Sequence, residues 1–254
     1  MTNVVLNKYE LLQEIGRGSF SAIYKAKDIY TGKCCAIKIE PKNRNSLIVR
    51  EAHIHNILHN VREIPKLLWF GFDEGQYYMV LPLLCGNFRG IHLDVADTMG
   101  EWFRIGHHML LAVRALHSKG YIHRDIKPDN FMYNDRGEIF LIDLGLCKQY
   151  VINGTHIAQK PRSTLIGTIN YISVNVHNME EPSRRDDVES VCYVLWKIWG
   201  GLDWDNNTTT HDALSTIKKK KIDLLYQPTI PCKLFELLHK TRDLNYWDEP
   251  CYEL

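Results

Sequence analysis

The chain has 254 residues, of which 45% are hydrophobic and 24% are charged, and its 31 basic side chains nearly balance its 30 acidic ones. A net charge this close to zero gives no general attraction to nucleic acid, so no nucleic-acid partner is expected. No apolar run approaches the roughly 18 residues that a membrane span requires, and residues 1–4 lack the basic region of a signal peptide. The seven cysteines are an odd number without a Cys-x-x-Cys pair, which indicates reduced thiols. We expect a monomer in the cytoplasm, the nucleus or both, without a membrane partner.

Strand-like segments dominate the first third of the chain, up to about residue 84. The predicted strands are residues 9–12, 22–26, 34–39 and 77–81. Pro82 interrupts the last of them. Between the third and fourth strands, residues 46–59 show the apolar spacing of a helix. This part of the sequence predicts a small, mostly β unit with one helix.

Helices are predicted to dominate the rest of the chain. Residues 102–118 carry apolar side chains at helical spacing, and so do residues 188–199, which end at Gly200-Gly201. The predicted fold class is α+β: one domain, residues 1–254, with a β-rich lobe over about 1–84 and a larger helical lobe over about 85–254. A ligand site is expected in the cleft between the lobes.

A glycine pair lies between the first two predicted strands, in Ile15-Gly16-Arg17-Gly18-Ser19-Phe20-Ser21-Ala22-Ile23. Glycines let a backbone approach phosphate groups closely, and a strand-turn-strand flap can cover them. A lone Gly-x-Gly is common in turns. This one gains weight because Ala36-Ile37-Lys38 follows some twenty residues on, and Lys38 is then a candidate partner for phosphates. Its other interpretation is an exposed strand lysine.

The most informative segment is Tyr121-Ile122-His123-Arg124-Asp125-Ile126-Lys127-Pro128-Asp129-Asn130, which Asp143-Leu144-Gly145 follows. It places a carboxylate, an ammonium and a carboxamide within six residues, at Asp125, Lys127 and Asn130. Phosphoryl transfer needs a carboxylate for the attacking hydroxyl, a cation near the phosphate and oxygen ligands for magnesium. An isolated Asp-Asn loop is normally a turn device, but the combined spacing favours chemistry.

Together these motifs resemble a protein kinase, and three further stretches resemble the casein kinase 1 and vaccinia-related kinase group. The stretches are Lys127-Pro128-Asp129-Asn130-Phe131-Met132, residues 167–177 and residues 183–190. In the second, Ser173-Val174-Asn175 stands where most kinases carry Ala-Pro-Glu. The similarity runs from about Tyr9 to the last residue. It implies a bilobal protein kinase fold and a casein kinase 1-like Ser/Thr phosphotransferase that uses ATP and Mg²⁺.

The resemblance also implies individual roles. Asp125 would orient and deprotonate the substrate hydroxyl, and Lys127 would neutralise charge on the transferring phosphoryl group. Asn130 and Asp143 would hold magnesium. Lys38 would bind the α- and β-phosphates and pair with Glu51, although Glu51 could also be a surface helix carboxylate. The remaining expected nucleotide contacts are Ile15, Gly16, Gly18, Ser19, Ile23, Ala36, the gatekeeper Leu81 and the hinge residue Leu84.

Further implied roles concern the substrate side. Thr168 would lie against Asp125, and Asp187 would cap its helix and anchor the catalytic loop backbone. Substrates would carry acidic or phosphorylated residues near the acceptor, which implies an anion site, with Arg184 and Arg185 as candidates. Residues 218–221, four consecutive lysines, have three interpretations: an extension of that surface, a nuclear-import signal, or a solvated turn between helices.

The chain departs from the family at several positions. Ser21 replaces the third glycine, Leu144 replaces the usual Phe, and the chain ends where relatives continue, so it resembles a short, C-terminally truncated member. The alternative function is an inactive pseudokinase that serves as a docking module. The sequence contains all five groups that phosphoryl transfer would use, which favours the active enzyme. They are Lys38, Asp125, Lys127, Asn130 and Asp143. A small-molecule kinase is a third possibility, against which the long segment from Asp143 to Ser173 argues.

Overall fold

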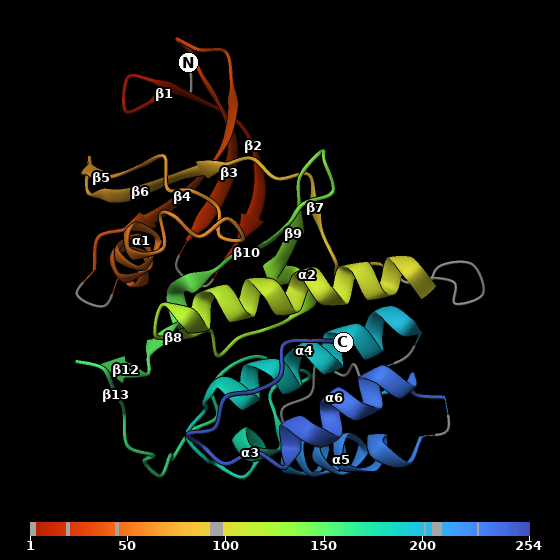
Figure 1. Cartoon of the computed structure of the whole chain (residues 1–254). Coiled ribbons are helices and arrows are strands. Elements are labelled where there is room, and N and C mark those ends of the chain that lie inside the picture. Colours follow the sequence, from red (N-terminus) through yellow and green to blue (C-terminus); the bar gives the residue numbers. More distant parts are fainter. Residues whose placement is uncertain are drawn as a thin grey trace. The chain divides into compact units, whose positions relative to one another are not determined.

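The computed structural model describes residues 4–18, 21–43, 46–91, 99–200, 202–204, 210–227 and 229–254. The chain forms two compact units, whose elements are labelled in Figure 1. The first unit comprises residues 1–86 and 132–145, and the second comprises residues 87–131 and 146–254. The first unit therefore includes a segment from the middle of the sequence, which a single boundary near residue 84 does not represent.

Six strands of the first unit form one antiparallel sheet in the order β1-β2-β3-β4-β6-β5. They are β1 (Val4–Val5), β2 (Tyr9–Arg17), β3 (Ala22–Asp28), β4 (Cys34–Pro41), β5 (Trp69–Asp73) and β6 (Gln76–Pro82). The four predicted strands are confirmed within β2, β3, β4 and β6. Alternation along the strands places one set of apolar side chains in a common buried cluster. That cluster consists of Tyr9, Ala26, Cys35, Ile37, Ile39, Tyr78 and Val80.

Helix α1 (Leu47–Ile57) packs against strand β6. Ile48 and Ala52 of the helix are buried with Met79 of the strand. Met79 lies directly opposite Lys38 in the β4–β6 register, so these two residues share a face of the sheet. The predicted helix over 46–59 is confirmed with slightly shorter bounds. The helix thereby covers the face of the sheet that carries Lys38.

Short elements join the two units along the chain. A three-stranded sheet has the order β10-β9-β7, from β7 (Gly86–Asn87), β9 (Phe131–Tyr133) and β10 (Ile139–Leu141). Two 3₁₀ turns flank its later strands, η1 (Pro128–Asn130) and η2 (Leu144–Leu146). Asn130 is thus the last residue of η1, and Asp143 directly precedes η2, so neither lies in a long loop.

The second unit is mainly helical. Its helices are α2 (Met99–Ser118), α3 (Val174–His177), α4 (Arg184–Trp199), α5 (His211–Asp223) and α6 (Cys232–Arg242). Its short elements are β8 (Tyr121–Ile122), β11 (Lys148–Gln149), β12 (Val151–Ile152), β13 (Thr155–His156) and η3 (Leu224–Tyr226). Helix α4 packs against α2 and α6 and is buried along most of its length. The predicted helices over 102–118 and 188–199 are confirmed within α2 and α4.

The start of α4 differs from the expectation for Asp187. Ser183 is the N-cap, and it forms a capping box with Asp186, whose carboxylate accepts the Ser183 N–H at 2.7 Å. Asp187 is therefore not the cap. It follows Asp186 in the helix, and its carboxylate has other partners. Gly200 ends the helix with φ at +140°, a conformation that only glycine adopts readily, and Gly201 lies outside the described residues.

The lysine run 218–221 belongs to helix α5 and is not a turn between helices. Lys221 has no exposed surface. Its ammonium donates to the carbonyls of Ile169 (2.8 Å) and Ile172 (2.6 Å) and lies 4.8 Å from the centre of the Tyr193 ring. Burial holds the pKa of Lys221 well below its ordinary value. The fourth lysine is therefore a structural group and does not contribute to a surface signal.

No described helix is both long enough and apolar enough to cross a membrane. No described group of three or more His, Cys, Asp or Glu side chains is arranged to hold a metal ion. All seven cysteines are free thiols.

Candidate active site

The glycine-containing turn joins β2 to β3. The register pairs Gly16 with Ile23 across the two strands. At the turn, the Gly18 N–H donates to the Ser21 carbonyl at 2.8 Å. A Cβ atom on Gly18 would lie 3.1 Å from the Ser21 hydroxyl, so a side chain there would crowd the turn. Ser19, a predicted phosphate contact, lies outside the described residues.

One face of the sheet brings four predicted nucleotide residues together. Ile23 lies opposite Lys38 between β3 and β4, and Ala36 lies opposite Leu81 between β4 and β6. Because Ala36 and Lys38 are two residues apart on one strand, all four side chains lie on the same face. Ile15 lies at the edge of this group, beside an irregularity in the β2–β3 register, and is about half exposed.

Lys38, Glu51 and Asp143 form a charged group that we call the nucleotide-side cluster. The Lys38 ammonium lies 2.6 Å from a Glu51 oxygen and 3.7 Å from Asp143 Oδ1. Glu51 is 2% exposed, so the expected ion pair is present and the alternative of a surface carboxylate is wrong. Burial alone would lower the pKa of Lys38, but the charges of Glu51 and Asp143 outweigh burial and raise it. The lysine is therefore held as a cation.

Asp143 has a strained backbone and an accessible carboxylate. Its φ is +61°, in the left-handed region of backbone conformation that residues other than glycine seldom adopt. Its side chain is 45% exposed, although Lys38 is within reach. Strain of this kind persists where the surrounding structure requires it, which is common at functional sites.

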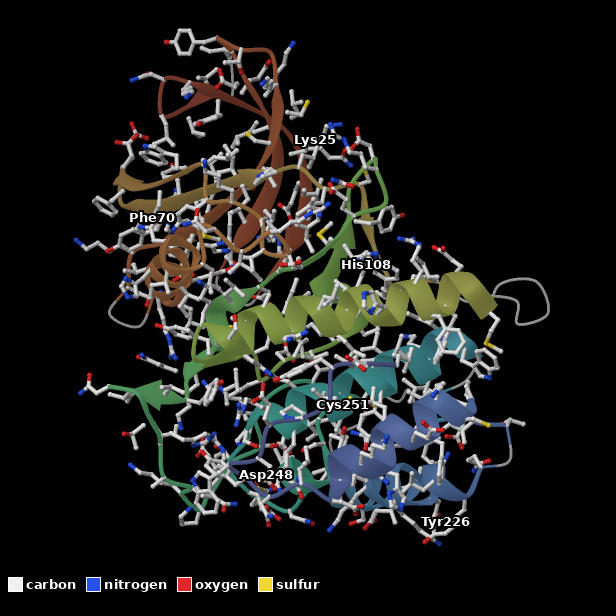
Figure 2. All side chains as sticks on the ribbon, in the orientation of Figure 1. Lys25, Phe70, His108, Tyr226, Asp248 and Cys251 are labelled. Carbon is white, nitrogen blue, oxygen red and sulfur yellow. The ribbon has the colours of Figure 1, made fainter. Side chains whose placement is uncertain are left out.

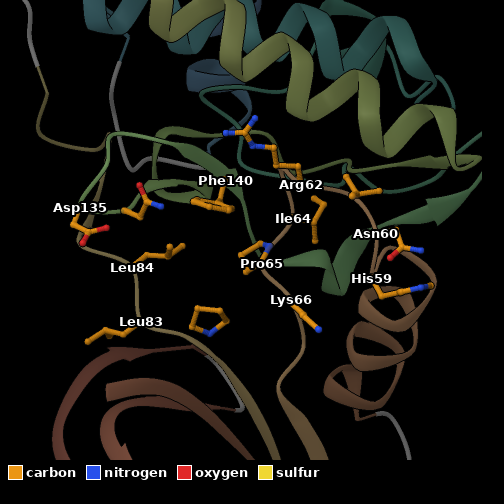
Figure 3. Close-up of a pocket in the computed structure, with 13 residues that line it drawn as sticks. His59, Asn60, Arg62, Ile64, Pro65, Lys66, Leu83, Leu84, Asp135 and Phe140 are labelled. Atoms are coloured by element: carbon orange, nitrogen blue, oxygen red, sulfur yellow. The ribbon is translucent and has the colours of Figure 1, made fainter. Parts of the chain in front are cut away.

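The side chain of Leu84, the predicted hinge residue, is separate from the other residues that are predicted to contact the nucleotide. Its side chain lines a pocket of about 510 Å³ together with Ile64, Pro65, Leu83 and Phe140 (Figure 3). None of the other predicted nucleotide residues lines this pocket. Within the described residues, however, the Leu84 backbone N–H donates to no other backbone group. The expected hinge role needs only that N–H, so the side chain's position does not conflict with it.

Asp125, Lys127, Asn130 and Thr168 form a second group in the other unit, which we call the catalytic-loop cluster. Asp125 Oδ1 accepts the Thr168 N–H at 2.8 Å and its hydroxyl at 2.7 Å. Asp125 Oδ2 accepts from the Lys127 ammonium at 2.7 Å. Burial alone would raise the pKa of Asp125, but Lys127 and these hydrogen bonds outweigh burial and lower it. Asp125 is therefore an ionised carboxylate.

Gly167 permits the contact between Thr168 and Asp125. Its φ is +95°, and a Cβ atom there would lie 2.6 Å from the Arg124 carbonyl and 3.0 Å from an Ile172 methyl group. No side chain fits in that space. The glycine lets the segment 167–173 approach the catalytic loop at backbone distance, which places the Thr168 hydroxyl on the carboxylate.

Asp187 anchors the catalytic loop, as the resemblance implied. Its carboxylate accepts the backbone N–H groups of His123 (2.6 Å) and Arg124 (2.9 Å). Burial alone would raise the pKa of Asp187, but its hydrogen bond and charge interaction with His117 outweigh burial and lower it. Arg124 has φ at +69°, so this pair of hydrogen bonds holds a backbone conformation that would otherwise be unfavourable.

The arginine pair does not form the expected anion site. Arg185 is 8% exposed, donates to the Leu244 carbonyl and forms an ion pair with Glu180 at 3.1 Å. Arg184 donates to the Trp247 carbonyl at 2.7 Å and lies 5.1 Å from the Tyr150 ring centre. Both guanidinium groups are used to hold the second unit together, and this geometry argues against phosphate binding by the pair.

Sequence reasoning missed one network around the catalytic loop. His117 Nε2 lies 2.9 Å from Asp187 Oδ2, and its Nδ1 lies 2.8 Å from the Tyr252 hydroxyl. These residues are 70 and 135 positions apart from His117. No local motif connects them, so only the folded chain reveals the link.

The chain was compared with models of known protein families. A model described as "Protein kinase domain" matches residues 9–243. The match begins at the first residue of β2, ends just after α6 and includes every residue of both clusters. The β-sheet unit and the helical unit agree with that fold. The chain therefore belongs to the protein kinase family, whose members transfer a phosphoryl group from ATP with the help of Mg²⁺.

Proposed function

We propose that the chain is an active Ser/Thr protein kinase of the casein kinase 1 group, which phosphorylates hydroxyls near acidic or already phosphorylated residues. The observation that carries the proposal is the state of Asp125. It is ionised, mostly buried and held by both Lys127 and Thr168. A docking module would have no need of a carboxylate kept in this form. The group assignment is supported by the motif residues 127–132, 167–177 and 183–190.

The catalytic-loop cluster supplies the acceptor chemistry. Asp125 accepts a hydrogen bond from the substrate hydroxyl, orients its oxygen toward the γ-phosphorus of ATP and takes up its proton as the new P–O bond forms. The bond between that phosphorus and the bridging oxygen of the β-phosphate breaks, and ADP leaves. Lys127 stabilises negative charge on the transferring group. The Thr168 N–H and hydroxyl hold Oδ1 of Asp125, and Oδ2, which accepts from Lys127, is the oxygen that would take the substrate hydroxyl's hydrogen bond.

The nucleotide-side cluster supplies the grip on ATP. Lys38 contacts the α- and β-phosphates, and Glu51 holds its ammonium in place from helix α1. The face formed by Ile23, Ala36 and Leu81 offers apolar contacts to the adenine. The N–H of Leu84, which donates to no backbone carbonyl of the described residues, offers a hydrogen bond. These side chains come from strands β3, β4 and β6 of one sheet and from helix α1, which packs against that sheet.

Asn130 of the second unit and Asp143 of the first unit each present an oxygen that suits magnesium. Asn130 uses its side-chain nitrogen to donate to the Asp125 carbonyl at 2.9 Å, which leaves its oxygen as the atom for a ligand. Asp143 presents an accessible carboxylate. Mg²⁺ prefers such hard oxygen ligands and takes the rest from phosphates and water, so a cluster of three protein ligands is not needed. When bound, the ion supplies charge stabilisation to the phosphates; Asn130 and Asp143 would hold it.

We also propose that activity does not require phosphorylation of the segment that follows Asp143. Glu181 is 4% exposed and pairs with Lys148 at 2.6 Å and with Arg162 at 3.5 Å. The Arg162 N–H donates to the Met179 carbonyl. These contacts hold the segment without an added phosphate on the exposed Ser163 or Thr164. Phosphatase treatment should leave activity intact; lost activity that phosphorylation of either residue restores would contradict this proposal.

The proposed function is tested by phosphate transfer. Labelled ATP and Mg²⁺ are supplied with casein, a phospho-primed acidic peptide and its unphosphorylated counterpart, and Asp125→Asn is the control variant. We expect label on Ser or Thr, more on the primed peptide, and about a thousandfold slower transfer with the variant. Absence of both ATP binding and transfer would contradict the active enzyme and favour the docking module, whereas ATP binding without transfer would mean that the substrate or a partner protein is missing from the assay.

A further inference from the structure

The last residues of the chain pack closely against the second unit. Labels on Asp248 and Cys251 mark this segment in Figure 2. Tyr246 is 2% exposed and Tyr252 is 8% exposed. A Cβ atom on Gly106 of α2 would lie 2.6 Å from a Leu254 methyl group, so the segment fits against a helix at a position that only glycine leaves open. This close fit makes the segment part of the core.

Tyr252 stands at one end of a continuous hydrogen-bonded chain. Its hydroxyl lies 2.8 Å from His117 Nδ1, and His117 Nε2 lies 2.9 Å from Asp187 Oδ2. Asp187 in turn accepts the backbone N–H groups of His123 and Arg124. The next link enters the reaction site, because the Asp125 N–H donates to His123 Nδ1 at 3.2 Å. Tyr252 is thus connected to the catalytic carboxylate's own backbone.

The protonation of Asp187 and Tyr252 determines how His117 is held between them. Asp187 is held as a carboxylate and can only accept, so His117 Nε2 must carry a hydrogen. Burial raises the pKa of Tyr252, so its hydroxyl keeps its proton. Nδ1 faces that hydroxyl at 2.8 Å, so both ring nitrogens are engaged and the ring of His117 is held in one orientation.

We propose that Tyr252 is a positioning residue for the catalytic loop. Its hydroxyl orients His117, His117 orients the Asp187 carboxylate, and Asp187 holds the backbone of His123 and of Arg124, whose φ is left-handed, so that Asp125 is placed. This inference rests on the proposed function for its catalytic meaning, but the hydrogen-bonded chain itself can be tested without any phosphate transfer.

The test compares Tyr252→Phe with Tyr246→Phe. Both variants remove one buried hydroxyl from the same segment, but the Tyr246 hydroxyl has no hydrogen-bond partner among the described residues. The first readout is hydrogen exchange of the His123 and Arg124 amides, resolved by NMR. We expect exchange about tenfold faster in Tyr252→Phe, as for the loss of one buried hydrogen bond, and unchanged in Tyr246→Phe. Equal rates in both variants would overturn the proposal.

The second readout is steady-state kinetics with ATP and the primed peptide. We expect Tyr252→Phe to lower kcat about fivefold with an unchanged KM for ATP, because the loop and not the nucleotide grip is disturbed. A purely structural hydroxyl would lower the melting temperature and leave kcat per folded molecule unchanged, and that result would overturn the proposal. If the wild-type chain transfers no phosphate, the proposed function fails, and the exchange comparison alone decides the role of Tyr252.

A double-mutant cycle locates the effect. In a His117→Leu background, Tyr252→Phe should cause no further increase in amide exchange, because the link it acts through is already gone. Additive effects would mean that Tyr252 acts by another route. Where His117→Leu does not fold, the single Tyr252→Phe comparison still supports or overturns the proposal.

Discussion

The two charged clusters are held in different ways. In the nucleotide-side cluster, Lys38 is positioned by charge, through two carboxylates on other elements. In the catalytic-loop cluster, Asp125 is positioned by hydrogen bonds from a backbone N–H, a hydroxyl and an ammonium. Asp187 then holds the preceding backbone through two more N–H groups. The first arrangement depends on a few charges, and the second on many short-range directional contacts.

This difference has consequences for how each cluster fails. Removal of one partner from a buried ion pair leaves an uncompensated charge, which is strongly destabilising. Removal of one hydrogen bond from a loop held by several shifts its geometry but leaves the fold in place. We therefore expect nucleotide-side substitutions to affect stability and activity together, and catalytic-loop substitutions to affect mainly activity.

The largest expected effect is that of Asp125→Asn. The variant should reduce kcat by about a thousandfold, because a general base contributes 10²–10⁴-fold and the new amide NH₂ would face the Lys127 ammonium. The melting temperature should change little, since the Thr168 contacts can persist. Single-turnover transfer and calorimetry measure the two quantities. A variant that retains a tenth of the activity would contradict the assignment of Asp125.

Lys38→Met is expected to affect both quantities. Activity should fall about a hundredfold through the lost phosphate contact, and the free energy of unfolding should fall by about 2–3 kcal/mol because Glu51 is left buried without its cation. The double variant Lys38→Met/Glu51→Leu should recover stability without recovering activity. Denaturant unfolding and kinetics separate these outcomes. A stable, inactive Lys38→Met single variant would remove the contrast between the clusters.

Gly167→Ala tests the close approach of segment 167–173. Gly154 is the matched control, because its φ of +77° is also left-handed but a Cβ atom there meets nothing within 4 Å. Gly154→Ala should cost about 1 kcal/mol of stability with unchanged kcat. Gly167→Ala should in addition lower kcat about tenfold, since the Arg124 carbonyl must move and the Thr168–Asp125 contacts with it. Equal kinetics for the two variants would show that the approach is not needed for transfer.

The smallest expected effect concerns His55, which lies on the same helix as Glu51. Its Nδ1–H donates to the Pro65 carbonyl at 3.0 Å, its Nε2 is buried without a partner among the described residues, and burial lowers its pKa to about 4. The unfolded chain takes up this proton below about pH 6.5 but the folded chain does not, so stability should fall as the pH drops from 6.5 toward 4.

His55→Asn removes that titration and keeps a donor for Pro65. The variant should lose about 1–2 kcal/mol less stability than the wild type between pH 7 and pH 5. Urea unfolding at several pH values measures the difference, and the exposed His53 on the same helix provides the control substitution, His53→Asn. Parallel stability curves for His55→Asn and the wild type would show that burial does not keep His55 neutral.

Local patterns explain what could be predicted from the sequence. Alternation and helical spacing located β2, β3, β4, β6, α1, α2 and α4. Asp125 and Lys127 stood out as candidates because they share one short motif, and Asp143 because its own Asp-Leu-Gly motif follows 13 residues after Asn130. The incorrect expectations concern residues whose environment is made by distant parts of the chain. Arg185 is occupied by Leu244 and Glu180, and Lys221 is buried under Ile169 and Ile172. Charge runs in the sequence do not reveal such partners.

The buried lysine of helix α5 also offers a chemical reporter. Amine-reactive reagents should modify Lys219, which is exposed, and should spare Lys221 as long as its ammonium is bound to the carbonyls of Ile169 and Ile172. Labelling of Lys221 requires those carbonyls to release it. Mass spectrometry of the peptides would give the rate at which Lys221 is modified. That rate would therefore measure how often the segment beside Thr168 detaches from the helix.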